Sequence, residues 1–255
     1  MKFITATHTD VGTRKKTNQD SMLVMQAQTE AGTVILAAMC DGMGGLAKGE
    51  VASAAMVRAL QSWFNNVLPS MLASGFNADA LKRSWENLVT ETSRRIAAHG
   101  ADMRVDMGTT ATVILIVGDA YYIMNVGDSR AYLISDAVYQ LTKDQTYIQR
   151  EIDLGHITEE DARNHPQKSV LLQCIGASNT VNPDFFSGQV KTNQVYMLCC
   201  DGFRHVIQPT EFYQSFSPQV LRNKTIMKKN AEALTKLNIQ RGEDDNISVI
   251  LIKTA

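Results

Sequence analysis

Five aspartates of this chain stand at the ends of apolar, β-branched segments. In three cases the segment runs directly into the aspartate, and in two the aspartate comes just before the segment. The five residues are Asp20, Asp41, Asp128, Asp201 and Asp245. A carboxylate at the tip of a buried strand is costly to desolvate unless a cation or hydrogen-bond donors compensate it, and several carboxylates together repel one another. The pattern therefore predicts a fold that gathers strand ends around divalent metal.

The choice of ligands indicates which metal and which chemistry to expect. Oxygen ligands without His or Cys are typical of hard cations, and Mn²⁺ or Mg²⁺ suit this chain better than Ca²⁺ because it has no dense EF-hand-like loop. Two such ions about 3.5–4 Å apart can share a bridging water or hydroxide, lower its pKa and direct it at phosphorus. A single Asp-Gly pair is more commonly just a turn, but five such sites together favour metal-assisted phosphoester hydrolysis.

The order of the predicted elements indicates the fold class. Apolar runs predict strands over residues 21–26, 33–40, 110–117, 120–126, 131–135, 195–200 and 247–252. Helical periodicity predicts helices over 51–68, 78–99 and 224–237, with Gly100 ending the second. Strand blocks and helix blocks are segregated, which favours an antiparallel α+β sandwich. No linker or repeat interrupts the chain, so we expect one domain over residues 1–255.

Composition excludes several classes of partner. The net charge of −1 gives no basic footprint for nucleic acid or an anionic membrane. No apolar run approaches the roughly 18 residues needed to span a bilayer, so we expect a cytoplasmic protein. The four cysteines are Cys40, Cys174, Cys199 and Cys200, and three lie in apolar runs where a thiol behaves as a small buried hydrophobe. Buried thiols are therefore expected in place of a zinc site.

The chain resembles the PPM, or type 2C, family of metal-dependent protein phosphatases in its compact bacterial form. The motifs that carry the resemblance occur in family order over residues 9–12 with 18–20, 41–45, 108–110, 125–130, 201–202 and 244–248. The resemblance implies a four-layer αββα sandwich, in which two antiparallel sheets are flanked by helix pairs, with a flap insertion over about 141–186. It also implies hydrolysis of phosphoserine and phosphothreonine in proteins.

Roles for the aspartates follow from the same resemblance. It implies that Asp41 bridges two Mn²⁺ or Mg²⁺ ions, that Gly42 supplies a backbone carbonyl, and that Asp201 and Asp245 complete the ligand set. Asp20 would act through coordinated water.

Asp128, together with Asp201, matches positions that hold a third, weaker metal in bacterial relatives. Asp128 can equally be a structural residue that caps the turn before Ser129 and Arg130. The sequence leaves both readings open.

The first motif departs from the family pattern. Five residues before Asp20, where the family has a phosphate-binding arginine, this chain has Lys15 beside Arg14. Neighbours in an extended segment face opposite sides, so one of the two reaches phosphate, and the register favours Lys15. Lysine lacks the bidentate fork of arginine, which predicts weaker substrate binding. The alternative is that both are solvated surface charges.

Three further positions bear on mechanism. Met43 stands where eukaryotic relatives carry a histidine general acid, so protonation of the leaving group would fall to metal-bound water or another group. His165 in the flap and His205 after the fourth aspartate are predicted to be structural or solvated side chains.

The resemblance implies phosphorylated proteins as substrates and a Ser/Thr protein kinase that the enzyme opposes, and we expect a monomer. One alternative is a phosphoprotein-binding regulatory module that has lost turnover, which Lys15 and Gln19 would explain. Another is a small-molecule phosphatase on the same scaffold. The intact set of Asp41, Asp201 and Asp245 favours an active enzyme over the first alternative.

Overall fold

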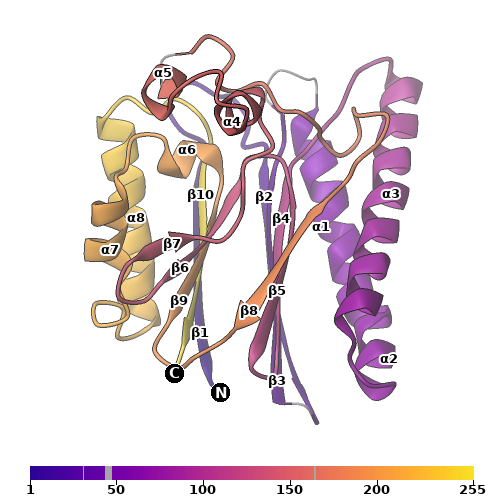
Figure 1. The fold of residues 1–255 in the computed structure, drawn as a ribbon, viewed down its shortest axis with the longest axis vertical. Helices are drawn as coiled ribbons and strands as arrows, with labels where there is room; N and C mark the ends of the chain where they lie inside the picture. Colours follow the sequence, from indigo (N-terminus) through magenta and orange to yellow (C-terminus); the bar gives the residue numbers. More distant parts are fainter. Residues whose placement is uncertain (31, 44–47, 164) are drawn as a thin grey trace.

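The computed structural model describes residues 1–30, 32–43, 48–163 and 165–255 (Figure 1). In these ranges the strands are β1 Phe3–Asp10, β2 Asp20–Thr29, β3 Gly32–Asp41, β4 Ala111–Val117, β5 Ala120–Val126, β6 Arg130–Ile134, β7 Val138–Gln140, β8 Asp184–Gln189, β9 Val195–Cys199 and β10 Ile247–Thr254. The helices are α1 Gly49–Asn66, α2 Leu68–Ala73, α3 Ala78–Met103, α4 Tyr147–Asp153, α5 Glu159–Arg163, α6 Asp201–Arg204, α7 Pro209–Phe216 and α8 Lys224–Gln240. The seven predicted strands and three predicted helices are confirmed.

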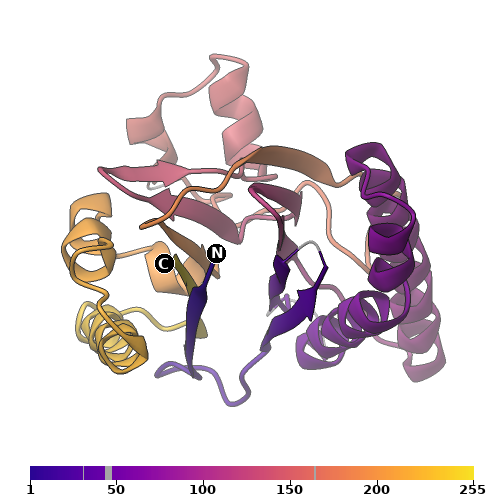
Figure 2. The same cartoon turned by 90° about the horizontal axis from the view of Figure 1, so that it is seen from below.

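The strands form two five-stranded antiparallel sheets. One has the order β1-β10-β9-β6-β7 and the other the order β2-β3-β4-β5-β8. The sheets face each other, with α7 and α8 outside the first and α1, α2 and α3 outside the second (Figures 1 and 2). The predicted α+β sandwich of four layers is confirmed.

The central strands of the second sheet are buried on both faces. In β3, Ile35, Ala37 and Met39 join the core between the sheets, while Leu36 and Ala38 join the core under α1 and α3. Successive side chains of a strand point to opposite faces, so a strand covered on both sides reads as a continuous apolar run. That is why this strand is visible in the sequence.

The helix pair over the second sheet buries one face of each helix. Trp63 of α1 and Trp85 of α3 lie with their ring centroids 5.7 Å apart. The prediction that Gly100 ends α3 is wrong, because the helix continues to Met103 and Arg104 takes the left-handed position after it, with φ 57°. Gly100 allows close packing instead, since a Cβ atom there would lie 2.6 Å from the carbonyl oxygen of Val105.

The flap contains two short helices, α4 and α5, above the ends of the sheets (Figure 1). The sequence indicates a helix start at Thr158, and its hydroxyl accepts from the backbone N–H of Asp161 while its own N–H donates to the Asp161 carboxylate. Residues 184–186, which the sequence places in the flap, belong to β8 and pair with β5. The predicted end of the flap helix at Asn164 lies outside the described residues.

Several elements carry no clear sequence signal, namely β1, β7, β8, α2, α6 and α7. β1 is an edge strand, paired on one side with β10, and only Ala6 in it is buried. An edge strand with one covered face has a weak apolar pattern.

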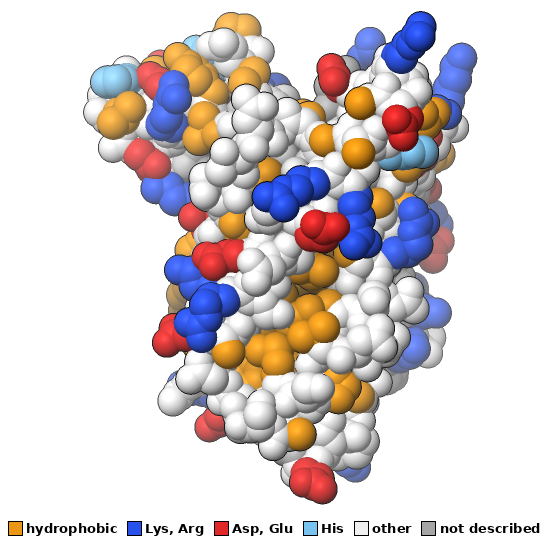
Figure 3. Space-filling view, turned by 90° about the vertical axis from the view of Figure 1, so that its right-hand side faces the viewer, with side chains coloured by type: hydrophobic (Ala, Val, Ile, Leu, Met, Phe, Trp, Pro, Cys, Tyr) orange, Lys and Arg blue, Asp and Glu red, His pale blue; other side chains and the backbone are white. Residues whose placement is uncertain are grey.

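The cysteines lie in the interior of the protein, and charged groups of both signs lie on its surface. All four thiols are free and buried. Basic and acidic side chains intermingle over the face that Figure 3 shows, which fits the net charge of −1. Among the described helices, none has a stretch both apolar and long enough for a membrane span.

Candidate metal centre

The hairpin of β2 and β3 places two of the predicted carboxylates side by side. Asp20 is the first residue of β2 and Asp41 the last of β3, and the antiparallel register pairs them directly. Both lie at the end of the sandwich that carries α6 and the flap, opposite the chain termini (Figure 1). A slip of either strand by one residue would turn its aspartate to the opposite face of the sheet and separate the two carboxylates.

Asp20 has a buried carboxylate that forms no hydrogen bond within the part of the chain that the structure describes. Burial raises the pKa of Asp20 to about 6, the polar side chains of Ser248 and Cys200 close by lower it in part, and the charges of Asp201 and Asp245 raise it further. Buried polar atoms are normally satisfied, and a buried carboxylate most of all. A divalent cation could bind this carboxylate together with that of Asp41 beside it. The residues present therefore fit a metal site.

The other aspartates converge on Asp41. Burial raises the pKa of Asp41 well above its ordinary value, and the charges of Asp20, Asp201, Asp128 and Asp245 raise it further. The other four aspartates therefore lie within electrostatic reach of Asp41, and we call the five residues the acidic cluster. The fold brings together residues that span positions 20 to 245 because each stands where a strand begins or ends at the same edge.

Cys200 is the one thiol whose ligand atom falls within the cluster. Its Sγ and the nearest oxygens of Asp20 and Asp41 all lie within 4.8 Å of one another. The thiol contacts the carbonyl oxygen of Asn246 at 3.3 Å and accepts from the backbone N–H of Ser248 at 3.1 Å. Burial raises the pKa of Cys200 well above its ordinary value. The sulfur is therefore a neutral group tied to the backbone, and the charged donors are carboxylates.

The Asp-Gly pairs serve close packing at this edge. A Cβ atom on Gly42 would lie 2.3 Å from the carbonyl oxygen of Gly49, and one on Gly202 would lie 2.2 Å from that of Asn246. Only glycine fits such contacts. Gly42 also forms a bridge to Thr109, and its N–H donates to the carbonyl of Gln19 at 3.1 Å. Both segments are held against their neighbours.

The motif at 108–110 holds the backbone of Asp41. The N–H of Asp41 donates to the hydroxyl of Thr110 at 2.9 Å, and the N–H of Thr110 donates to the carbonyl of Asp41 at 2.8 Å. The hydroxyl of Thr109 donates to the same carbonyl at 3.0 Å. The two threonines thus fix the position of Asp41.

Asn246 ties the first motif to the last. Its side chain donates to the carbonyl oxygen of Val11 at 2.9 Å and accepts from the N–H of Gln19 at 2.8 Å. It holds the segment before Asp20 against the start of β10. In the sequence, only its place beside Asp245 in the final motif points to a role for Asn246. Its contacts are seen only in the structure.

Lys15 and Arg14 point to different surroundings. Lys15 Nζ lies 2.9 Å from Asp245 Oδ1, whereas Arg14 Nη1 lies 2.7 Å from Asp244 Oδ2 with its side chain 79% exposed. Burial alone would lower the pKa of Lys15, but the hydrogen bond and charge of Asp245, with Asp41 and Asp201, raise it. Lys15 therefore faces the acidic cluster and Arg14 lies outside it.

His205 and Glu243 form a link that the sequence does not reveal. The Nδ1 atom of His205 lies 3.3 Å from Glu243 Oε2 and its Nε2 atom lies 3.6 Å from Asp201 Oδ2. The other oxygen of Glu243 accepts the backbone N–H groups of Asp244 and Asp245. This pair connects the segment of Asp201 with that of Asp245. His165, by contrast, stays in the flap, with its ring centroid 6.2 Å from that of Tyr147.

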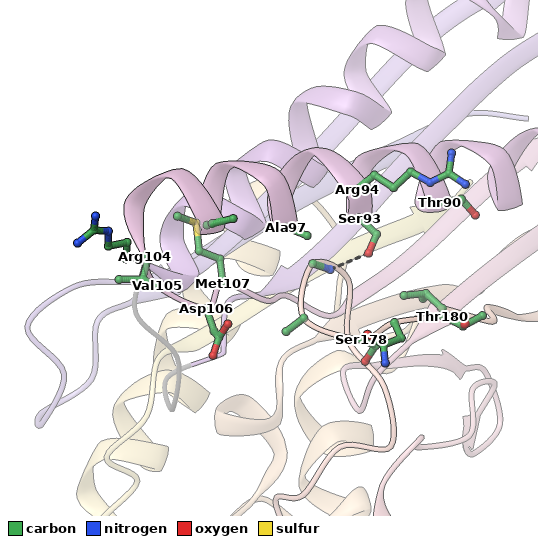
Figure 4. Close-up of a pocket in the computed structure, with 16 residues that line it drawn as sticks. Thr90, Ser93, Arg94, Ala97, Arg104, Val105, Asp106, Met107, Ser178 and Thr180 are labelled. Carbon is green, nitrogen blue, oxygen red and sulfur yellow. Dashed lines mark hydrogen bonds between the residues drawn. The ribbon is translucent and has the colours of Figure 1, made fainter.

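A cavity of about 700 Å³ lies beside this centre, between the C-terminal half of α3 and residues 176–181 (Figure 4). No member of the acidic cluster lines it. At its floor the N–H of Gly176 donates to the Ser93 hydroxyl at 3.0 Å. The preceding residue, Ile175, pairs with Thr109, whose hydroxyl donates to the carbonyl of Asp41. The cavity is thus a neighbour of the metal centre and separate from it.

Comparison with known proteins gives one consistent family. Residues 8–237 match the family model described as protein phosphatase 2C. The serine/threonine phosphatase stp of Listeria monocytogenes serovar 1/2a is 32% identical over 250 residues, covering 96% of this chain and 93% of that protein. The serine/threonine protein phosphatase PstP of Mycobacterium tuberculosis H37Rv is 31% identical over 251 residues, covering 96% of this chain and 44% of that protein.

Solved structures agree in fold. The serine/threonine phosphatase of S. agalactiae superposes with a TM-score of 0.85 at 28% identity, over 100% of both chains. The catalytic domain of PstP in complex with 2 manganese ions superposes with a TM-score of 0.78 at 27% identity, over 99% of this chain and 98% of that one.

Proposed function

Since the chain belongs to the protein phosphatase 2C family, we propose that it hydrolyses phosphoserine and phosphothreonine in proteins with the help of Mn²⁺ or Mg²⁺. The single observation that carries the proposal is the buried carboxylate of Asp20, which lies beside Asp41 and has no hydrogen-bond partner among the described residues. Relatives that share 93% of their length with this chain are named serine/threonine phosphatases. We assign the activity to one catalytic domain, residues 1–255, with the flap over about 141–186.

Two ions per chain are proposed, held by Asp41, Asp201, Asp245 and the carbonyl of Gly42, with Asp20 acting through water. The manganese-bound relative supports this choice of metal. Such cations supply positive charge to a phosphoryl group and make water a better nucleophile at neutral pH. The protein's part is to gather the carboxylates, and Thr109, Thr110 and the glycines fix their positions.

Lys15 is the proposed phosphate-binding side chain. Its ammonium group already faces the cluster, 2.9 Å from Asp245, so a short rearrangement brings it to a phosphate at the metal centre. A lysine neutralises a phosphate as a point charge, with fewer fixed hydrogen bonds than an arginine. Arg14 is occupied by Asp244 at the surface and is not proposed to bind substrate. Met43 has no proton to give, so no side chain at that position protonates the leaving group.

The substrate class sets the wider context. Phosphorylated proteins come from a protein kinase, so we propose that this enzyme opposes a Ser/Thr protein kinase in the cytoplasm and acts as a monomer. The net charge of −1 does not favour nucleic acid as a partner.

The test compares p-nitrophenyl phosphate, a phosphothreonine peptide and a sugar phosphate, each with and without Mn²⁺. Wild type should hydrolyse the first two only with metal, and Asp41→Asn should lose at least about 100-fold in kcat/KM, a loss of about 2.7 kcal/mol in transition-state stabilisation. Asp136→Asn, at an exposed turn between β6 and β7, is the matched control and should keep full activity. Metal-independent turnover, or an active Asp41→Asn, would refute the proposal. Preference for the sugar phosphate would make it a small-molecule phosphatase.

A further inference from the structure

Arg204 lies between two buried carboxylates at the edge of the acidic cluster. Its Nη2 atom donates to the backbone carbonyl of Asp128 at 3.0 Å and lies 3.7 Å from Asp128 Oδ2. The same atom lies 3.3 Å from Asp144 Oδ2. The side chains of Arg204, Asp128 and Asp144 are 12%, 11% and 8% exposed. A guanidinium group thus sits where a buried aspartate needs positive charge.

A second arginine leaves the charge of Arg204 available to Asp128. Arg130 donates two hydrogen bonds to Asp144, from Nε to Oδ1 at 2.7 Å and from Nη2 to Oδ2 at 2.7 Å. Such a two-bond pair satisfies a carboxylate geometrically and electrostatically. The formal charges of the two arginines and two aspartates therefore sum to zero without an added ion.

Asp201, the other residue predicted to hold a third metal ion, also has a close neighbour, His205. Asp201 Oδ2 lies 3.6 Å from a ring nitrogen of His205, which Glu243 holds from the other side. Asp20, at the proposed two-metal centre, has no hydrogen-bond partner among the described residues. The two ends of the acidic cluster thus differ: Lys15 contacts Asp245 but leaves Asp20 without a partner among the described residues, whereas Arg204 lies 3.7 Å from Asp128.

A further divalent ion does not fit beside Asp128. It would have to share this carboxylate with a guanidinium group that stays protonated at any pH at which the protein folds, and the two cations would repel each other. Moving Arg204 away would strand a buried charge, because its guanidinium is enclosed by Asp128 and Asp144.

We propose that Arg204 acts as a built-in cation that takes the place of a third metal ion, so that the chain binds two ions and Asp128 is a structural residue. Arg204 is a positioning residue, since it acts through Asp128 and not on substrate. This inference rests on the proposed metal-dependent function, and its test counts metal ions and does not measure turnover.

The experiment is equilibrium dialysis of each purified variant against millimolar Mn²⁺, followed by mass-spectrometric counting of bound manganese per chain. Wild type should bind two ions, and Asp128→Asn should leave that number unchanged. Arg204→Met removes the charge at similar length and should add a third, weaker ion. Arg204→Met with Asp128→Asn should return to two, and Arg204→Lys, which keeps the charge, should stay at two.

Three ions on wild type, falling to two with Asp128→Asn, would overturn the inference and leave the proposed function intact. A folded Arg204→Met that still binds two ions would also overturn it. If Arg204→Met does not fold even with Mn²⁺, the comparison of wild type with Asp128→Asn decides alone. Wild type that binds no manganese would overturn the proposed function and this inference together.

Discussion

Asp20 and Asp41 are direct partners in the register of β2 and β3, so the buried carboxylate of Asp20 lies beside the partly buried one of Asp41 at one end of a sheet. In the absence of bound metal this pairing opposes folding, because like charges repel and neither oxygen of Asp20 has a hydrogen-bond partner among the described residues. The same pairing is what allows a cation to stabilise the fold. Stability and metal binding are thus linked through these two residues.

We therefore expect Asp20→Asn to stabilise the metal-free protein. Removing a buried, uncompensated charge should raise the free energy of unfolding by on the order of 1–3 kcal/mol. The variant should also lose much of the stabilisation that Mn²⁺ gives wild type. Urea unfolding with EDTA and with Mn²⁺ measures both effects, and Asp136→Asn serves as the exposed control. A lower stability of Asp20→Asn in EDTA would show that the carboxylate is satisfied without metal.

Lys15 and Arg14 should differ in their effect on substrate binding. Lys15→Ala should raise KM for p-nitrophenyl phosphate about tenfold, the size of a lost charge-assisted hydrogen bond of about 1.5 kcal/mol. Arg14→Ala should change KM less than about twofold, because its partner is Asp244 at the surface. Lys15→Arg should lower KM, since it restores a bidentate donor. Equal effects of the two alanine variants would contradict the assignment of Lys15.

Gly176→Ala should destabilise the protein strongly. The residue has φ +104°, and an added Cβ would lie 2.4 Å from Ile96 Cγ2 and 2.7 Å from the carbonyl oxygen of Met107. Strain and overpacking together should cost about 2–5 kcal/mol of unfolding free energy. Gly155→Ala is the matched control, because it has φ +72° but open space around the added atom, so it should lose only about 1 kcal/mol. Similar losses in thermal or urea unfolding would rule out the steric explanation.

Glu211 should contribute stability that depends on pH. The hydrogen bonds from Arg241, and then that from the N–H of Gln208, lower its pKa to about 2. A carboxylate whose folded pKa is lowered stabilises the fold above its unfolded pKa, near 4.3, and loses this effect as pH falls toward the folded value.

Glu211→Gln should therefore be less stable than wild type at pH 7, and the gap should narrow between about pH 4 and 2. Urea unfolding at several pH values measures the gap. The control is Glu232→Gln, which breaks an exposed pair with Lys236 in the middle of α8. Glu211, by contrast, also accepts the backbone N–H of Gln208 at the start of α7. Because surface pairs contribute little, its gap should be smaller at every pH. A gap for Glu211→Gln that widens in acid would contradict the role of its charge.

The sequence predicted the central strands and long helices because burial leaves a periodic trace. β3 and β4 are covered on both faces and read as continuous apolar runs, and α1 and α3 repeat apolar residues at helical spacing. Gly100 was misread because glycine has two uses, helix termination and close packing, and only the neighbouring carbonyl of Val105 distinguishes them. The edge strand β1 buries too little to be seen, and the short flap helices are marked only by local signals at their ends, such as Thr158.

What the sequence determined by itself is the set of donors and their order: an aspartate at each strand end, the glycines beside them, and a lysine in place of an arginine. Each of these is a pattern of a few neighbouring residues, so it can be recognised in the sequence without knowledge of the fold. What only the tertiary structure decided is which charges meet: Asp20 facing Asp41 without a partner, Lys15 turned inward and Arg14 outward, and Arg204 beside Asp128. Those pairings join residues up to 230 positions apart, as in Arg14 with Asp244, and depend on sheet register and packing, which no short stretch of sequence encodes.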